Sequence, residues 1–217
     1  MEIGNVMKTF RYGLTCTRLR FPEQGTWTLH KPESYFAPTT EWRQSPISGE
    51  PILINLIHEI DLLHYMFGSI ASVSALETRK GRGFEVEEGP AVLLGFESSV
   101  VDSFVFCDAA PSPWNFEAGT GENPTIPHVQ TSAGAGGFYR VLGSKASLSV
   151  PDMTRWSYDD VGERKEKGWG ENLTRERLEV DNVVVPFDAQ IEHFIDGSKE
   201  TSCSGEEGLR AVVVVKQ

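Results

Sequence analysis

The chain has 217 residues, of which 39% are hydrophobic and 24% charged, and this composition is typical of a globular protein with its own core. The formal net charge of −11 argues against nucleic acid as a partner, because phosphate backbones select clustered Lys and Arg. No apolar run reaches the about 18 residues that a membrane helix needs, so we expect no membrane association.

The first third of the sequence predicts a strand, a loop and a helix in that order. Alternating residues rich in Thr, Phe, Tyr and Val predict a strand over residues 6–19. Residues 22–51 hold five of the twelve prolines and predict an ordered loop. A helical spacing of apolar residues predicts a helix over residues 51–67, and Gly68 is a suitable C-terminal cap for it.

Strand signals dominate the rest of the chain. Residues 70–79 alternate, and the apolar runs 91–96 and 100–107, separated by a short polar turn, predict a hairpin. Residues 111–137 are rich in Gly, Pro, Asn, Ser and Thr and predict a long loop of the kind that often carries function. The remaining predictions are a hairpin of residues 138–142 and 146–150, a charged solvated stretch over 159–177 and a short helix over 187–194.

Many strands with two or three helices predict an α+β fold, a large, mostly antiparallel open sheet with a few helices packed on one face. Residues 1–217 are treated as a single domain of this kind. The second face of such a sheet needs a cover, so we expect a homodimer through the sheet. Three cysteines in no paired spacing, with no signal pattern at the N-terminus, predict reduced thiols and a cytoplasmic protein.

The helix over residues 51–67 carries the strongest candidates for chemistry. Asn55, His58, Asp61 and Tyr65 follow one another at intervals of three or four residues and therefore share one face of the helix. Histidine exchanges protons near neutral pH, and an aspartate one turn away can orient its ring. We therefore assign His58, Asp61 and Asn55 as candidate catalytic residues, and the alternative is a core histidine bonded to a backbone carbonyl.

A second group of side chains is suited to binding a small organic substrate. Lys31, Tyr35 and Arg43 can bind carboxylate, carbonyl or hydroxyl oxygens, and their alternative role is to anchor their own loop. The candidate substrate-binding residues are Lys31, Tyr35, Arg43, Tyr65, Trp114, Asn123 and His128. No metal site is expected, because leucine occupies position 62, where the zinc-protease helix motif that begins with His58 and Glu59 needs a second histidine.

Seven short motifs occur in a fixed order along the chain. They lie at residues 3–6, 31–36, 42–43, 58–61, 121–124, 143–148 and 204–210, and they read IGNV, KPESYF, WR, HEID, GENP, GSKASL and SGEEGLR. Together they resemble the C-terminal domain of the Gfo/Idh/MocA oxidoreductases, the relatives of glucose–fructose oxidoreductase and inositol dehydrogenase. The resemblance runs over nearly the whole chain.

The resemblance implies a domain that binds the substrate and makes oligomer contacts, beside an N-terminal Rossmann domain that holds NAD(P). The family motif D-x-x-x-H-x-x-D places its histidine, which exchanges a proton with the substrate hydroxyl, on His58 and its last aspartate on Asp61. The first aspartate falls on Ile54, which cannot do the same work, and Asn55 lies beside it. The resemblance also implies that the sequence stops inside the last helix of the family.

The sequence has no strand, glycine-rich turn and helix of a dinucleotide-binding domain. The glycine-rich residues 133–137 lack the required spacing and precede a predicted strand instead of following one. Lys31 and Pro32 follow a histidine, so they are not the Glu-Lys-Pro motif that carries the catalytic lysine of the family in its Rossmann domain. We expect no cofactor bound by this chain alone, and NAD(P) only where a separate Rossmann domain is supplied.

Three functional hypotheses follow. The main one is a stand-alone enzyme that acts on a small organic metabolite without a cofactor, by isomerisation, dehydration or cyclisation; the replacement at Ile54 favours this enzyme or a non-catalytic module over a dehydrogenase half. The first alternative is the substrate-binding half of an NAD(P)-dependent dehydrogenase. The second is a ligand-binding or dimerisation module without catalysis. In both enzymatic hypotheses, His58→Ala abolishes activity and leaves the fold intact.

Overall fold

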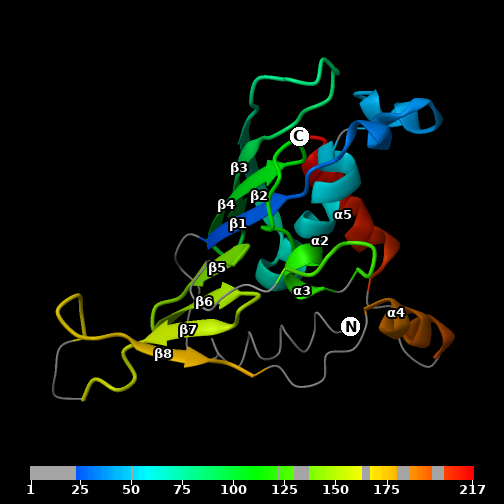
Figure 1. The fold of residues 1–217 in the computed structure, drawn as a ribbon. Coiled ribbons are helices and arrows are strands. Elements are labelled where there is room, and N and C mark those ends of the chain that lie inside the picture. The colour runs from blue at the N-terminus through cyan, green and yellow to red at the C-terminus, as the bar shows by residue number, and fades with distance from the viewer. Residues whose placement is uncertain are drawn as a thin grey trace.

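The structure is a computed structural model that describes residues 23–49, 51–121, 123–129, 137–162, 167–179, 186–196 and 203–217. Within these ranges eight strands form one open sheet in the order β2-β3-β4-β1-β5-β6-β7-β8 (Figure 1). All neighbouring strands are antiparallel except β1 and β4. The strands are β1 (Glu23–Thr28), β2 (Ile70–Leu76), β3 (Ala91–Phe96), β4 (Val101–Cys107), β5 (Tyr139–Leu142), β6 (Ala146–Val150), β7 (Thr154–Ser157) and β8 (Thr174–Arg177). The predicted α+β class with a mostly antiparallel open sheet is therefore confirmed.

The helices lie on one side of the sheet (Figure 1). They are α2 (Ile57–Phe67), α3 (Phe116–Thr120), α4 (Pro186–Ile195) and α5 (Gly205–Val215), together with the 3-10 turns η1 (Glu33–Phe36) and η2 (Pro38–Gln44) and the π-helical turn η3 (Ile52–Leu56). Helix α2 packs against α5, and both contribute to the buried core. None of the described helices is both long and apolar enough to cross a membrane.

Helix α2 turns its apolar stripe toward the sheet. Leu56, Ile60, Leu63 and Phe67 are buried at the spacing of one helical face, whereas His58 and Tyr65 are exposed. The predicted division of this helix into an apolar and a polar face is confirmed. The helix is less buried than its nearly continuous apolar sequence suggested, because it forms the outer layer of the domain.

Helix α5 has the cap that its sequence needs. Ser204 accepts a hydrogen bond from the backbone N–H of Glu207, and the Glu207 carboxylate accepts one from the backbone N–H of Ser204. This capping box offsets the low helix propensity of the valine-rich run that follows. Ala211 and Val214 then face the core, so this stretch is the helix that the family resemblance implied.

Two loop predictions were wrong in part. The predicted loop over residues 22–51 contains β1, η1 and η2, and the predicted loop over 111–137 contains α3. The predicted solvated stretch 159–177 ends in β8, and β7 had no prediction. The strand predicted over residues 6–19 lies outside the described residues, whereas both predicted hairpins, the strand after residue 70 and the helices near 51–67 and 187–194 are confirmed.

Strand β1 was missed because its central residue is glycine. A Cβ atom at Gly25 would lie 2.4 Å from Cδ2 of Phe104 and 2.9 Å from Cε1 of Tyr139. Gly25 therefore lets two aromatic rings from the neighbouring strands β4 and β5 meet over β1. A glycine between prolines usually indicates a loop, although here Gly25 permits the close packing of two aromatic rings.

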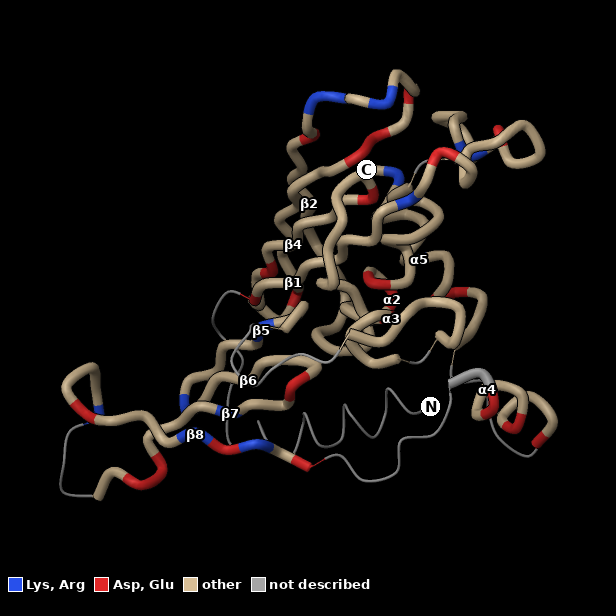
Figure 2. The backbone as a smooth tube through the Cα atoms, viewed as in Figure 1, with Lys and Arg blue, Asp and Glu red and all other residues tan. Residues whose placement is uncertain are grey.

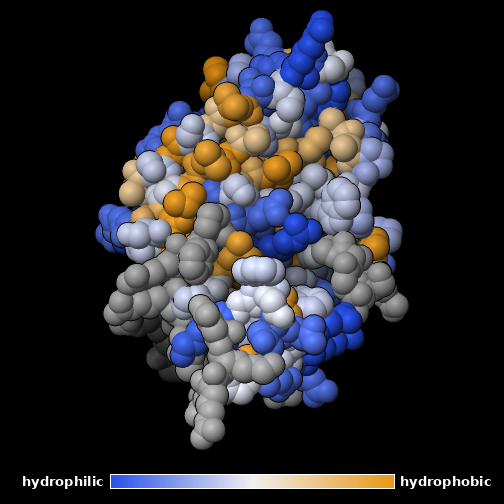
Figure 3. Space-filling view, turned by 90° about the vertical axis from the view of Figure 1, so that its left-hand side faces the viewer, coloured by the Kyte–Doolittle hydropathy of each residue, from blue (hydrophilic) through white to orange (hydrophobic). Residues whose placement is uncertain are grey.

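The other face of the sheet is open. On β3 and β4 the outward positions alternate with the buried ones and carry no charged side chain. Figure 2 accordingly shows β2 and β3 without charged residues, and Figure 3 shows an apolar patch on the side of the molecule that this face occupies. The exposed large side chains on this face include Leu76, Leu93, Val101 and Val105, which are 79%, 54%, 44% and 44% exposed.

Candidate functional site

Lys31 lies just beyond the end of β1, and the backbone fixes its position. The N–H of Leu29 donates to the carbonyl of Cys107, and the N–H of Lys31 donates to the carbonyl of Asp108, so the pairing with the β4 side continues past the strand. The ammonium nitrogen of Lys31 lies 5.5 Å from the ring centroid of Trp27 and 4.8 Å from that of Tyr35. These are cation–π distances, and they place a lysine charge between two aromatic rings.

Arg43 adds a second cation to the same aromatic group. Its guanidinium lies 3.8 Å from the ring centroid of Tyr35 and 5.3 Å from that of Trp42, and its Nη1 donates to the carbonyl of Tyr35 at 2.9 Å. Arg43 thus anchors its own loop, which is the alternative to substrate binding that the sequence left open for this residue. We call Trp27, Lys31, Tyr35, Trp42 and Arg43 the cation–aromatic cluster.

The Lys31 charge is partly desolvated and is not neutralised by contact. Burial lowers the pKa of Lys31, the carboxylates of Glu117 and Asp108 act in the opposite direction, and Arg43 lowers the pKa further. Among the described residues no ion pair joins Lys31 to a carboxylate. A half-buried ammonium without an ion-pair partner is available to an anionic or polar ligand.

The neighbouring charged side chains, by contrast, form ion pairs with one another. Arg82 of the β2–β3 loop forms ion pairs with Asp108 at 2.5 Å and with Glu88 at 3.4 Å, and its guanidinium lies 4.7 Å from the ring centroid of Phe36. Phe36 of η1 in turn contacts Phe84 of the same loop, with the two ring centroids 5.1 Å apart. This network fastens the segment that carries Tyr35 to the β2–β3 loop.

Of the three predicted catalytic residues, His58 is exposed, whereas Asp61 and Asn55 are half-buried. His58 is exposed and makes no hydrogen bond or ion pair within the described part of the chain. Asp61 is half-buried and lies near the start of α5, where burial and then Asp61 raise the pKa of the Cys203 thiol. Asn55 donates from Nδ2 to the carbonyl of Pro51 at 3.3 Å. Asn55 thus lies in the π-helical turn η3 and His58 and Asp61 lie on α2, and no hydrogen bond within the described residues joins the three side chains.

A π-helical turn leads into this helix. Such turns are uncommon and often occur at functional sites. In η3 the backbone N–H of Ile57 bonds to the carbonyl of Ile52, and the N–H of Ile52 donates to Oε1 of the buried Glu87 at 2.8 Å. The Glu87 carboxylate thus holds the helix N-terminus, where an anion is favoured.

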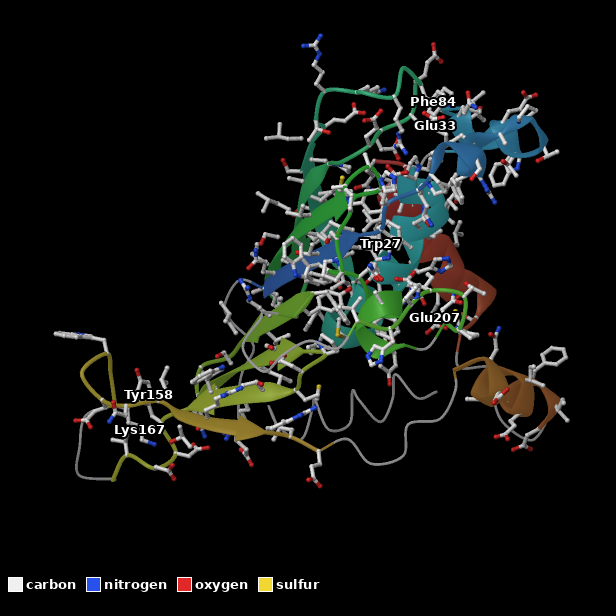
Figure 4. All side chains as sticks on the ribbon, viewed as in Figure 1. Trp27, Glu33, Phe84, Tyr158, Lys167 and Glu207 are labelled. Atoms are coloured by element: carbon white, nitrogen blue, oxygen red, sulfur yellow. The ribbon has the colours of Figure 1, made fainter. Side chains whose placement is uncertain are left out.

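One buried cluster connects α2 with the cation–aromatic cluster. Trp27 is buried in the same core as Leu56 and Ile60 of α2. Its indole stacks on the ring of Phe106, with the two ring centroids 4.9 Å apart. Figure 4 shows Trp27 between the sheet and the helices. The ring that lies beneath Lys31 therefore belongs to the same buried core as the apolar face of α2.

The segment around α3 places the remaining candidates. Trp114 accepts hydrogen bonds at its carbonyl from both the N–H and the hydroxyl of Thr28, which fixes it to the end of β1, and its side chain is 49% exposed. Asn123 accepts from the N–H and hydroxyl of Thr125, which is a local turn contact. His128 is exposed, and its ring would meet a Cβ at Gly121 at 3.0 Å.

Two residues near the candidate site, Glu117 and Trp27, were not predicted as site residues from the sequence. Both carboxylate oxygens of Glu117 on α3 accept from the indole N–H of Trp27, at 3.2 Å and 3.4 Å. Glu117 stands in the sequence read as a loop, so no helical spacing pointed to it. Trp27 stands in the other such loop and was not assigned as a site residue. The proximity of Trp27 and Glu117 depends on the pairing of β1 in the sheet and on the packing of α3 against it.

The described residues form neither a Rossmann unit nor a cluster of metal-ligating side chains. The one parallel pair among the described strands, β1 and β4, is separated in the chain by helix α2 and by the two further strands β2 and β3, whereas a Rossmann unit has a single crossover helix there. Most of the glycine-rich segment 133–137 lies outside the described residues. No group of three His, Cys, Asp or Glu in the described part is placed to hold a metal ion.

Comparison with known families gives one match. Residues 23–217 match the model of the oxidoreductase family, C-terminal alpha/beta domain, named for the Gfo/Idh/MocA proteins. No curated protein matches the sequence significantly.

Solved structures of low sequence identity share the fold. UDP-N-acetylglucosamine 3-dehydrogenase GnnA from Acidithiobacillus ferrooxidans aligns with TM-score 0.63 and 11% identity, over 98% of this chain and 56% of that chain. The WlbA dehydrogenase from Bordetella pertussis, in complex with NADH and UDP-GlcNAcA, gives 0.58 and 14%, over 98% and 55%. An oxidoreductase from Agrobacterium radiobacter, in complex with NAD+, L-tartaric acid and magnesium, gives 0.53 and 14%, over 98% and 57%. The chain thus spans little more than half the length of these structures.

Proposed function

Since the chain belongs to the Gfo/Idh/MocA oxidoreductase family, whose C-terminal domain it matches over residues 23–217, we propose that it provides the substrate-binding half of an NAD(P)-dependent dehydrogenase. The cofactor belongs to a separate Rossmann domain in this proposal, because the described residues form no Rossmann unit. The cofactor-independent isomerase, lyase or cyclase favoured by the sequence gains no support from the comparisons, where dehydrogenases recur.

The observation that carries this proposal is the free charge of Lys31. In a chain of net charge −11, a half-buried ammonium without an ion-pair partner, set between two aromatic rings, is suited to an anionic substrate group. The ligands named with two of the similar structures, UDP-GlcNAcA and L-tartaric acid, are hydroxylated acids. We therefore propose a hydroxylated carboxylate or phosphate as the substrate class.

His58 has the acid–base role in the proposed reaction. It stands exposed on α2, where it would accept the proton of the substrate hydroxyl, and a nicotinamide cofactor held by another domain would supply the hydride acceptor. Asp61 and Asn55 on the same helix face polarise and orient this site, and Tyr65 borders it one turn on. The exposed Trp114 offers its indole to the apolar side of a sugar-like ring.

The remaining predicted substrate residues have supporting roles. Arg43 stacks on Tyr35 and sets the ring that faces Lys31. Asn123 and His128 shape the segment after α3, where Asn123 closes a turn and His128 lies against Gly121. These contacts anchor the loop in which they occur, and we assign substrate contact first to Lys31 and His58.

The open sheet face is proposed as a homodimer interface. Its outward side chains on β3 and β4 are small or aliphatic and uncharged, and Figure 3 shows apolar residues gathered on this side of the molecule. Two copies of a flat uncharged face are complementary to each other, whereas a charged partner finds no counter-charge there. A second copy of the chain is therefore the occupant that this surface fits.

The experiment is a two-dimensional NMR titration of the 217-residue chain with D-glucuronate. Binding is expected to shift the indole signals of Trp27 and Trp114, and Lys31→Met should weaken binding by about tenfold or more through loss of a charge-assisted hydrogen bond. Lys145→Met removes an exposed lysine from the turn between β5 and β6 and is the matched control.

Three outcomes decide the proposal. Shifts that disappear in Lys31→Met and persist in Lys145→Met support it. Equal shifts in both variants place the anion elsewhere and overturn the role of Lys31. Tight binding of NADH or NADPH to the same chain overturns the assignment of the cofactor to a separate domain.

A further inference from the structure

Glu117 and Lys31 flank the same indole with opposite charges. The carboxylate of Glu117 accepts from Nε1 of Trp27, and the ammonium of Lys31 lies over the ring of the same tryptophan. The two residues come from different elements, α3 and the segment after β1, so their approach depends on the fold and not on sequence spacing. Trp27 itself is buried, so the core holds in place the indole ring that both charged side chains contact.

The two charges attract each other but do not meet. Glu117 is the strongest of the carboxylates acting on the pKa of Lys31, yet no ion pair joins the two residues within the described part of the chain. The other charged groups that face Lys31 are Asp108, already paired with Arg82, and Arg43, which stacks on Tyr35. The interval between Lys31 and Glu117 thus has a donor on one side and an acceptor on the other.

A ligand that fits this interval needs a matching pair of groups. An anionic oxygen accepts from the Lys31 ammonium, and a hydroxyl on the adjacent carbon donates to a free lone pair of the Glu117 carboxylate. A plain carboxylic acid meets only half of this arrangement and brings its charge near Glu117 without compensation. Both side chains are half-buried, so a bound ligand displaces little water beyond the interval itself.

From this geometry we propose that Glu117 is a specificity-determining residue, which selects ligands that carry a hydroxyl next to their anionic group. The inference rests on the proposed function, in which Lys31 binds the anionic group. It adds a second recognition element that lies outside the family motif on α2 and that comes from the segment around α3.

The test compares two small acids that differ only in hydroxyl groups, L-tartrate and succinate, in NMR titrations of the whole chain. The wild-type protein should bind tartrate about tenfold more tightly than succinate, the effect of one hydrogen bond to a charged group. Glu117→Gln should remove most of this preference while retaining the acceptor for the Trp27 indole, and it should leave succinate binding equal or slightly stronger. Glu33→Gln neutralises an exposed carboxylate on η1 and is the matched control.

The outcomes separate this inference from the function on which it rests. If wild type binds both acids equally, or if Glu117→Gln keeps the preference, the selection by Glu117 is refuted although Lys31 still binds anions. If neither acid binds and D-glucuronate also fails, the proposed function falls, and this inference falls with it. Loss of tartrate preference in Glu33→Gln as well would mean a general charge effect and would also refute the assignment.

Discussion

The two faces of the sheet differ in whether they carry ionisable side chains. The covered face encloses Glu23 and Asp102 at opposed positions of β1 and β4, and Glu59 of α2 bonded to the Tyr139 hydroxyl. The open face of β3 and β4 carries only small or aliphatic side chains. One set of strands thus supports ionisable groups at desolvated positions on one side and a surface without charge on the other.

This difference agrees with the two tasks proposed for the domain, substrate binding and self-association. Desolvation changes proton affinities and strengthens hydrogen bonds, so a face with buried ionisable groups can support a chemical site. An uncharged flat face has no such use, but two copies can cover it mutually without leaving a charge unpaired. The proposed substrate site therefore lies beside the helices, and the proposed interface lies on the open face.

The largest expected effect contrasts two neighbours on β4. Phe106 is fully buried and stacks on Trp27, so Phe106→Ala should lower the free energy of unfolding by about 3–5 kcal/mol. Val105 points to the open face and is 44% exposed, so Val105→Ala should change it by less than about 1 kcal/mol. Urea unfolding of both variants measures this, and similar losses in the two would contradict the assignment of the faces.

The next effect concerns the buried carboxyl group of Glu23. Burial, and then the proximity of Asp102, raise the pKa of Glu23 from 4.5 to about 9. The folded state therefore keeps this group neutral while the unfolded state ionises it, so stability is lost as the pH rises from about 4.5 to about 9. Glu23→Gln should remove this loss and stabilise the protein at pH 8 by on the order of 2 kcal/mol.

Thermal unfolding of wild type and Glu23→Gln between pH 5 and pH 9 is the measurement. The two curves should lie close together near pH 5 and separate as the pH rises. A variant that is destabilised by the same amount throughout this range would show that Glu23 is charged and paired in the folded protein.

The smallest effect on the fold comes from the open face. Leu93 is 54% exposed at the middle of β3, so Leu93→Lys should change the stability of the monomer by less than about 0.5 kcal/mol. The same change places two lysine charges in a self-associated interface and should convert the dimer into monomer. Light scattering at micromolar concentration measures the mass, and a wild-type protein that is already monomeric would contradict the proposed interface.

The sequence predicted the parts of the fold that have strong local signals. Both hairpins, with polar turns between apolar runs, and the helix around His58, with its apolar stripe, were recognisable. The strand β1 was missed because Gly25 and nearby prolines read as a loop, although the glycine permits the contact of Phe104 and Tyr139. Helix α3 was missed because one and a half turns are too short for a periodic pattern.

The candidate site was predictable to a smaller extent. The face shared by His58 and Tyr65 follows from helical spacing, and the structure agrees with it. The proximity of Lys31 to Trp27 and of Trp27 to Glu117 depends on strand pairing and on the docking of α3, which are contacts between segments distant in the sequence. Local patterns do not contain that information.

The most direct test of the account is a crystal structure of the chain with D-glucuronate bound. The account predicts the carboxylate within hydrogen-bond distance of the Lys31 ammonium, a hydroxyl at Glu117 and the sugar ring on the side of His58. A ligand bound on the open sheet face, or one that avoids Lys31 altogether, would contradict the assignment of this region as the substrate site.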